Sequence, residues 1–256
     1  MFDTHAHLFD NKLLDNNIDF LLEKINKLNF IGIICICETE QEINFFLNYY
    51  KKYNFLYCSI GIHPHNAKEF SLQKLTSLFN KVYPTGRLVA IGETGLDFYY
   101  NFSSAEQQVN CFLSHIEFAK KCSLPLIIHS RNSNQKIVEI LKYNNVEHGV
   151  IHCFSGDYIF AKSVLDLGLY LGFTGIVTFK NNKNYEELIL KLPEDKIVIE
   201  TDSPYLSPEP FRGKINTPLN LVYILEKISK FRNSDLEDLE KIMDTNSLKL
   251  FNSLKL

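Results

Sequence analysis

The sequence predicts an α/β protein of the (β/α)8 TIM-barrel type, and three observations lead to this fold class. The chain has 256 residues, a length that is typical of such a barrel. It contains eight apolar, β-rich runs, and segments with helical spacing separate them. Strands that alternate with helices indicate parallel βαβ units, and eight such units in one chain suggest a closed barrel.

The eight expected strands are short runs rich in branched and aromatic apolar residues. In chain order they are MFDTHAHL, IGIICIC, FLYCSIGIHP, RLVAIGETGLD, LPLIIHSR, GVIHCFSG, LYLGFTG and KIVIETDSP. Between them, apolar residues recur at i, i+3, i+4 and i+7 over residues 43–50 and 109–116, which is the spacing of one helical face. The segments NTPLNLVYILEKISK and LEDLEKIMDTNSLKLF also predict helices.

The sequence shows no low-complexity linker and no break in composition, so we expect one barrel domain over residues 1–256. An open, doubly wound sheet is the alternative arrangement of such units. No GxGxxG motif follows the first strand, and the dinucleotide binding that accompanies that fold therefore has no support in the sequence.

Composition and charge narrow the class of protein. Hydrophobic residues make up 45% of the chain and charged residues 22%, as in an ordinary soluble protein. The net charge is −3, which argues against a broad basic face for long duplex DNA but not against an enzyme that binds a phosphate locally. The sequence shows no signal peptide and no apolar run long enough to span a membrane. Its six cysteines include no CxxC pair. We expect a cytoplasmic monomer with reduced thiols, no membrane contact and no obligate protein partner.

Ionisable residues gather at the expected carboxyl ends of the strands, where the active site of a (β/α)8 barrel forms. They are four histidines and two carboxylates: His5, His7, Glu93, His129, His152 and Asp202. Taken alone, the alternating pair His5 and His7 is as typical of a satisfied polar pair as of a metal site. Six such groups at one end of a barrel are costly to bury unless they are paired or bind metal. The set therefore predicts a metal centre.

The number and type of these groups indicate two metal ions. A closed structural zinc site takes four ligands, whereas six mixed nitrogen and oxygen ligands suit two divalent ions with open positions. Glu93, midway in the ligand order, could bridge the ions, and Asp202 could bind one ion and accept a proton from an activated water. Histidine ligands favour Zn²⁺ or Mn²⁺ and phosphodiester chemistry favours Mg²⁺, so all three ions remain open.

Eight motifs in a fixed order carry a family resemblance from residue 2 to about residue 218. They are FDTHAHL, GIHPH, IGETGLDFY, PLIIHSR, HCFSG, GFTGIVTFK, IETDSPYLSP and RGKINTP. Together they resemble the TatD-like metal-dependent hydrolases (TatD-type deoxyribonucleases) of the amidohydrolase superfamily. The resemblance implies that the six residues above are the metal ligands, that Glu93 is the bridge, and that the reaction is hydrolysis of phosphodiester bonds in DNA. No ligand position departs from the family pattern.

Four further residues are expected to contact the substrate. His63 and His65 lie in GIHPH at the end of the third strand, and for His63 the alternative is a hydrogen-bonded support of the ligands. Arg131 follows His129 by two positions and could hold a phosphate through its planar fork, or form a salt bridge at the barrel rim. Arg212 lies in a proline-rich loop that could recognise a phosphate backbone or only seal the barrel.

Two more features leave alternatives open. Phe98, Tyr99 and Tyr100 could stack on bases of a single strand, but packing within their loop is the favoured interpretation. Glu200 is expected to point into the barrel below Asp202 as a hydrogen-bonded support rather than a ligand.

These observations favour a metal-dependent deoxyribonuclease with exonuclease character on single-stranded or frayed DNA, acting through a water activated by two metals. A hydrolase of a small-molecule ester, amide or phosphoester on the same dinuclear site is one alternative. A non-catalytic barrel that binds nucleic acid or protein is another, and it would predict degraded ligands.

Overall fold

A computed structural model describes residues 1–28, 30–180 and 184–252 of the chain. The strands are β1 (Phe2–Ala6), β2 (Gly32–Cys37), β3 (Leu56–Ile60), β4 (Leu88–Asp97), β5 (Leu126–Arg131), β6 (Gly149–Ile151), β7 (Tyr170–Phe173) and β8 (Ile197–Ile199). The α-helices are α1 (Asn11–Leu14), α2 (Ile18–Lys27), α3 (Glu40–Tyr49), α4 (Leu72–Val82), α5 (Ala105–Cys122), α6 (Asn134–Tyr143), α7 (Tyr158–Leu165), α8 (Asn184–Lys191), α9 (Leu221–Arg232) and α10 (Leu236–Leu250). Short 3-10 helices are η1 (Pro64–Glu69), η2 (Tyr83–Thr85), η3 (Gly175–Thr178), η4 (Glu194–Lys196) and η5 (Pro218–Asn220).

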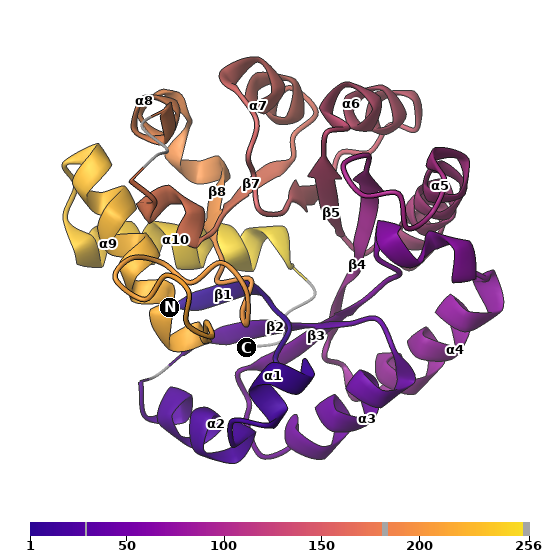
Figure 1. The fold of residues 1–256 in the computed structure, drawn as a ribbon, viewed down its shortest axis with the longest axis horizontal. Coiled ribbons are helices and arrows are strands. Elements are labelled where there is room, and N and C mark those ends of the chain that lie inside the picture. The colour runs from indigo at the N-terminus through magenta and orange to yellow at the C-terminus, as the bar shows by residue number, and fades with distance from the viewer. Residues whose placement is uncertain (29, 181–183, 253–256) are drawn as a thin grey trace.

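The strands form one parallel sheet in which each strand pairs with the next, from β1 to β8, and the helices surround it (Figure 1). Two backbone hydrogen bonds bring the segment after β8 beside β1. The N–H of Asp202 donates to the His5 carbonyl over 2.9 Å, and the N–H of His7 donates to the Ser203 carbonyl over 2.7 Å. The predicted (β/α)8 barrel is therefore confirmed as a nearly closed barrel.

Local sequence explains where the predicted helices begin. The α3 helix starts after Thr39, whose side chain accepts the N–H of Glu42 while Glu42 binds back to the Thr39 backbone. The α5 helix starts with the same reciprocal capping box between Ser104 and Gln107. Such a box satisfies two backbone donors that a helix start leaves free.

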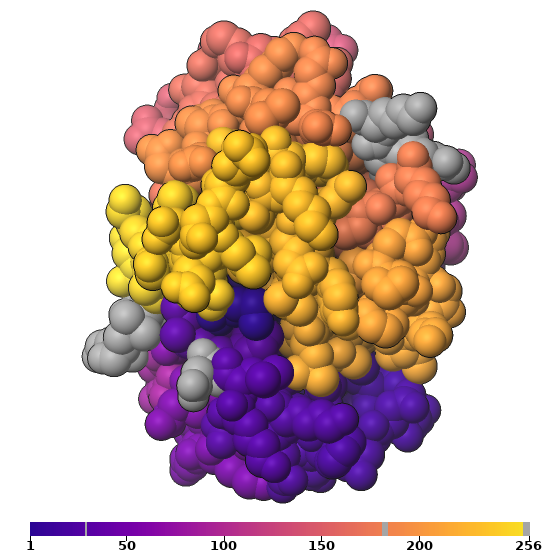
Figure 2. All heavy atoms as spheres, turned by 90° about the vertical axis from the view of Figure 1, so that its left-hand side faces the viewer, coloured from indigo at the N-terminus to yellow at the C-terminus, as the bar shows by residue number. Residues whose placement is uncertain are grey.

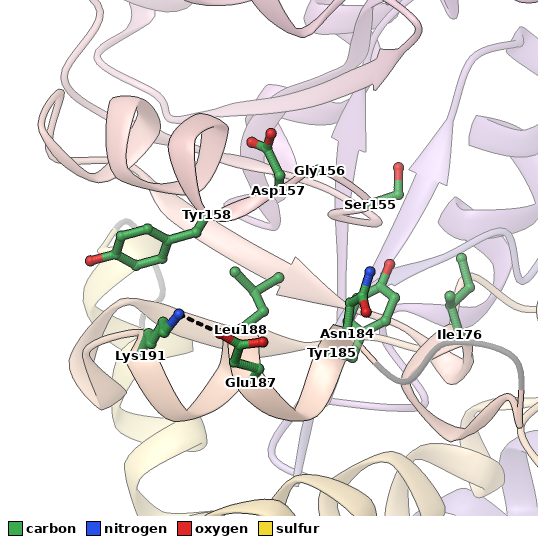
Figure 3. A pocket seen from close by; sticks show the side chains of 10 residues that line it. All are labelled: Ser155, Gly156, Asp157, Tyr158, Ile176, Asn184, Tyr185, Glu187, Leu188 and Lys191. Atoms are coloured by element: carbon green, nitrogen blue, oxygen red, sulfur yellow. Dashed lines mark hydrogen bonds and ion pairs between the residues drawn. The ribbon is translucent and has the colours of Figure 1, made fainter.

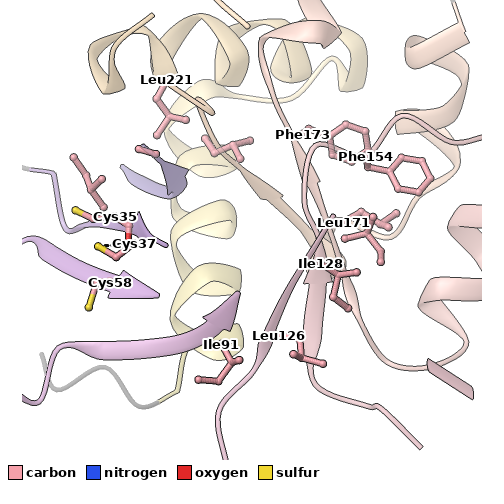
Figure 4. Packing of buried hydrophobic residues seen from close by; sticks show 14 of the residues in the cluster. Cys35, Cys37, Cys58, Ile91, Leu126, Ile128, Phe154, Leu171, Phe173 and Leu221 are labelled. Carbon is pink, nitrogen blue, oxygen red and sulfur yellow. Dashed lines mark hydrogen bonds between the residues drawn. The ribbon is translucent and has the colours of Figure 1, made fainter. Parts of the chain in front are cut away.

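Alternate side chains of the strands enter two separate apolar clusters. One cluster lies between the sheet and the helices and includes the buried thiols Cys35, Cys37 and Cys58 (Figure 4). The other contains strand residues such as Ile34 and is completed by Phe251 from the C-terminal segment. That segment lies against the N-terminal strand, as Figure 2 shows in yellow and indigo. All six cysteines are free thiols, as expected.

Two strands that carry predicted ligands are irregular. The pairing of β1 with β2 shifts register between Asp3 and Ala6, and the pairing of β4 with β5 shifts between Ile91 and Thr94. The run RLVAIGETGLD is confirmed as the fourth strand, because β4 extends to Asp97, which pairs with Arg131 of β5. Glu93, expected at the carboxyl end of this strand, lies within it instead. Register shifts re-aim side chains and are frequent beside active sites.

A histidine outside the predicted site fixes the segment that follows β3. His115 lies on α5 and is fully buried. Its Nε2 accepts the N–H of Ile62 over 3.1 Å, and its Nδ1 lies 2.8 Å from the Cys111 carbonyl, to which it donates. Burial lowers the pKa of His115 to about 4. Among the described residues, no helix is long and apolar enough to cross a membrane.

The pKa of His115 predicts a pH dependence of stability. The unfolded chain protonates this imidazole near pH 6.5, whereas the folded protein does so only near pH 4. The stabilisation is therefore complete above pH 6.5 and is lost as the pH falls toward 4. Between pH 7 and pH 5, the free energy of unfolding should fall by about 2 kcal/mol more in the wild type than in His115→Gln. Urea unfolding at both pH values measures this difference, and parallel losses in the two proteins would contradict it.

Candidate metal centre

The structure brings the six predicted ligands together at one end of the barrel. His5, Glu93 and His129 lie in β1, β4 and β5. His7 and His152 directly follow β1 and β6, and Asp202 lies just beyond β8. Except for the fully buried His5, these residues line a cavity of about 740 Å³. Parallel strands direct their carboxyl ends to the same rim, which is why residues so far apart in sequence meet here.

A first group of ligand atoms surrounds one oxygen of Glu93. Glu93 Oε2 lies 3.3 Å from His5 Nε2 and 3.6 Å from His7 Nε2. Asp202 Oδ1 lies 3.6 Å and 3.5 Å from the same two nitrogens, which are 3.2 Å apart. Bonds of about 2.1 Å to a tetrahedral ion separate its ligand atoms by about 3.4 Å. The spacing of this group therefore fits a divalent ion.

A second group surrounds the other oxygen of Glu93. Glu93 Oε1 lies 2.8 Å from His129 Nδ1, 3.1 Å from His152 Nε2 and 3.5 Å from His63 Nε2. The sequence analysis assigned His63 to the substrate, but the structure places it among atoms close enough to share an ion with Glu93 and His129. Each oxygen of one carboxylate thus faces its own set of imidazoles.

Electrostatics keep both carboxylates of the cluster ionised. Burial raises the pKa of Glu93, but the charges of His152, His63 and His5 outweigh it and hold this pKa well below its ordinary value. Burial likewise raises the pKa of Asp202, but the hydrogen bond from His7 and the charges of His152 and His5 together outweigh it, so that this pKa is also lowered. Two ionised carboxylates among imidazoles are a donor set that suits a divalent transition metal.

Glu200 supports the cluster from inside the barrel, as predicted. Its Oε1 accepts the N–H of Cys153 over 2.6 Å and lies 3.2 Å from His152 Nδ1. Its Oε2 accepts the hydroxyl of Thr4 over 3.1 Å. A Cβ at Gly172 would lie 2.7 Å from Glu200 Oε2, so the glycine leaves the space that this carboxylate occupies. A carboxylate on the far nitrogen of a histidine fixes its ring orientation and tautomer.

Asp97 and Glu38 are two carboxylates that the sequence analysis missed. Asp97 Oδ2 lies 2.8 Å from His65 Nε2 and 3.2 Å from His129 Nε2. Glu38 directly follows β2 and lines the cavity, and burial raises its pKa to about 8. Two sequence features could have identified these carboxylates. Glu38 directly follows the ICIC strand, and Asp97 lies an even number of positions after Glu93 in the same run.

The residues predicted to contact the substrate lie in two separate places. His65 and Arg131 line the cavity with the ligands. For Arg131 the sequence allowed either a phosphate contact or a salt bridge at the barrel rim. In the structure its guanidinium lies 4.1 Å from the ring centre of Tyr99. Arg212 is not among the residues that line the cavity, and its guanidinium lies 4.1 Å from the ring centre of Phe179.

A second cavity of about 560 Å³ lies between the segment after β6 and α8 (Figure 3). Its lining residues are Ser155, Gly156, Asp157, Tyr158, Ile176, Asn184, Tyr185, Glu187, Leu188 and Lys191. It contains the exposed ion pair of Lys191 with Glu187, and none of the three ligand clusters in the described part of the chain lies there. The chemistry is therefore assigned to the cavity around Glu93.

Metal binding should stabilise the fold through Glu93. Added to chelator-treated protein at a hundred times its dissociation constant, Mn²⁺ should raise the free energy of unfolding by about 2.7 kcal/mol per site. Thermal unfolding should show an increase of several degrees in the wild type and little or none in Glu93→Gln, which removes a charge that both groups share. Glu147→Gln changes an exposed glutamate in the segment before β6 and should respond like the wild type. Equal stabilisation of Glu93→Gln would mean that the ions bind elsewhere.

Comparisons with known proteins agree with this geometry. A family model described as TatD related DNase matches residues 2–252. A metal-dependent hydrolase of Buchnera aphidicola subsp. Acyrthosiphon pisum is 37% identical over 261 residues, covering 98% of this chain and 99% of that protein. A protein of Erwinia amylovora named 3'-5' ssDNA/RNA exonuclease TatD is 34% identical over 205 residues, covering 77% of this chain and 79% of its own.

The fold is shared with solved structures as well. The crystal structure of a TatD homologue from Escherichia coli K12 superposes with a TM-score of 0.90 at 26% identity and covers 98% of both chains. The chain therefore belongs to the TatD-related DNase family of metal-dependent hydrolases, and its fold is a TIM barrel.

Proposed function

We propose that this hydrolase is a deoxyribonuclease that cleaves phosphodiester bonds at the ends of single-stranded or frayed DNA with the help of two divalent ions. The observation that carries the proposal is the position of Glu93, whose two oxygens face separate groups of imidazoles 2.8–3.6 Å away. The name of the Erwinia amylovora relative, a 3'-5' ssDNA/RNA exonuclease, supports a single-stranded substrate.

The ligands divide between two ions. His5, His7 and Asp202 would hold one ion, His129 and His152 would hold the other, and Glu93 would bridge them. Mg²⁺, Mn²⁺ and Zn²⁺ are all candidates, and the imidazoles favour Mn²⁺ or Zn²⁺. Two such ions supply positive charge for the attacking and leaving oxygens and lower the pKa of a water between them.

The protein's own groups would then bind the phosphate and move the proton. Asp202 would accept the proton of the attacking water, since its lowered pKa keeps its carboxylate ionised. His63 and His65 line the same cavity and would contact the scissile phosphate, and the exposed guanidinium of Arg131 would reach it from the rim. Arg212 would contact only a part of the DNA strand that lies outside the cavity.

The shape and charge of the cavity favour strand ends. Its volume of about 740 Å³ is that of a small-ligand pocket, which admits a terminal nucleotide but not a duplex. Asp10, Glu42 and Glu69 also line it, so a long polyanion would be repelled at its edge. Affinity would come from the ions and a few local cations such as Arg131. We also infer that residues 1–256 form one domain, since one family model spans nearly all of them.

A nuclease assay with end-labelled, single-stranded DNA tests the proposal. The wild type should shorten the strand with Mn²⁺ or Mg²⁺ and fail with chelator, and Asp202→Asn should lower the rate by about 100-fold or more because the proton acceptor is lost. Asp195→Asn changes an exposed aspartate before β8 and should retain the wild-type rate. Labels at either end report the polarity of cleavage. A folded, metal-loaded protein that leaves DNA intact but hydrolyses a small ester or phosphoester would overturn the nuclease proposal.

A further inference from the structure

Three large aromatic side chains remain exposed where the segment after β4 borders the metal cavity. The exposed fractions are 55% for Tyr99, 38% for Tyr100 and 56% for Phe102. Tyr100 and Phe102 line the cavity that Glu93 also lines. Packing within the loop was the favoured interpretation of the sequence. Phe98 packs against the core, and Tyr99 and Tyr100 contact each other within the loop while both remain exposed.

The exposed rings and one cation form a continuous surface, here called the aromatic rim (Tyr99, Tyr100, Phe102 and Arg131). The rings of Tyr100 and Phe102 are stacked, with centres 5.4 Å apart and planes 25° from parallel. Tyr99 meets Tyr100 edge-on at 4.8 Å. The Arg131 guanidinium lies 4.1 Å from the ring centre of Tyr99 and 4.8 Å from that of Tyr100. The rim therefore combines partly exposed aromatic rings with a positive charge that lies over two of them.

The backbone of the rim is held in place before any ligand arrives. Asp97 Oδ1 accepts the N–H groups of Tyr99 and Tyr100 over 3.0 Å and 3.1 Å. The hydroxyl of Ser103 donates to the His65 carbonyl over 2.8 Å and accepts the N–H of Lys68 over 3.0 Å. A surface that is already ordered loses less conformational entropy when it binds a ligand.

The rim is also continuous with the metal centre. The other oxygen of Asp97 lies 3.2 Å from Nε2 of His129, one of the predicted ligands. The ring of His65 contacts Tyr100 at 5.3 Å and Phe102 at 4.9 Å, and it contacts His63 at 4.2 Å. A group bound on the rim and a phosphate bound in the cavity are therefore close enough to belong to the same molecule.

We propose that the aromatic rim binds an unpaired nucleobase of the strand whose phosphate occupies the metal cavity. This inference rests on the proposed nuclease function and names the feature of the substrate that the protein recognises. Aromatic faces bind bases by stacking, and every base has such a face, so the rim would tolerate any sequence. In a duplex those faces are covered by neighbouring base pairs, and the rim would therefore select single strands. The charge of Arg131 matches the backbone of the same strand.

Binding of two oligonucleotides tests the rim without requiring catalysis. One probe is fluorescently labelled oligothymidylate, and the other is the same strand with abasic residues in place of its bases. Fluorescence anisotropy with chelator, and again with Ca²⁺, compares their affinities. The wild type should bind the thymidylate strand about tenfold more tightly than the abasic strand. In the double variant Tyr100→Leu, Phe102→Leu, the two strands should bind equally, with the abasic affinity unchanged.

Matched variants separate the ring from other effects. Tyr100→Phe keeps the aromatic face and should keep the tenfold preference. Tyr143→Leu removes a tyrosine that is 85% exposed at the end of α6, away from the cavity lining, and should also behave like the wild type. Arg131→Gln should weaken binding of both strands, because the phosphates are common to them. Circular dichroism verifies that each variant is folded.

The outcomes distinguish this inference from the proposed function. Equal binding of both strands by the wild type, or an unchanged preference in the double variant, would overturn the base-binding rim even if the protein cleaves DNA. A base preference that the double variant loses would support the rim even if metal-dependent cleavage is absent and the nuclease proposal fails.

Discussion

Glu93 is a carboxylate buried among histidines, and the organisation of the barrel mouth depends on it. Its side chain is 2% exposed, and a buried charge of this kind is costly unless compensating groups surround it. The compensation comes from histidines in β1 and β5 and from histidines after β3 and β6, which direct ring nitrogens at one or the other of its oxygens. Strands distant in sequence thereby contact the same side chain. The same contacts divide the histidine nitrogens into two groups, each with the spacing of metal ligands.

A further layer of carboxylates supports these donors. Glu200 lies 3.2 Å from Nδ1 of His152, and Asp97 lies 3.2 Å from Nε2 of His129. The Asp97 carboxylate has a second role, because its other oxygen fixes the backbone of Tyr99 and Tyr100. One side chain therefore connects the metal centre with the aromatic surface at its rim.

Much of this arrangement is encoded in patterns that a sequence displays directly. Apolar runs that each end in a histidine or carboxylate indicated both the barrel and the end of it that carries the site, as for His129 and His152. Other features depend on three-dimensional pairing. The register shift in β4 arises from pairing with β5, which no local pattern in the fourth run reveals. The position of Arg212 on Phe179 and the exposure of Tyr100 likewise depend on how loops fold over the rim.

The central claim is that Glu93 bridges two ions, and electron paramagnetic resonance of the Mn²⁺-loaded protein tests it most directly. Two Mn²⁺ ions that share a carboxylate lie about 3.5–4 Å apart and couple magnetically. The account predicts two Mn²⁺ per chain and a spectrum of exchange-coupled ions in the wild type, with the coupling lost in Glu93→Gln. A single Mn²⁺ per chain at saturation, or two ions with an uncoupled spectrum, would contradict it.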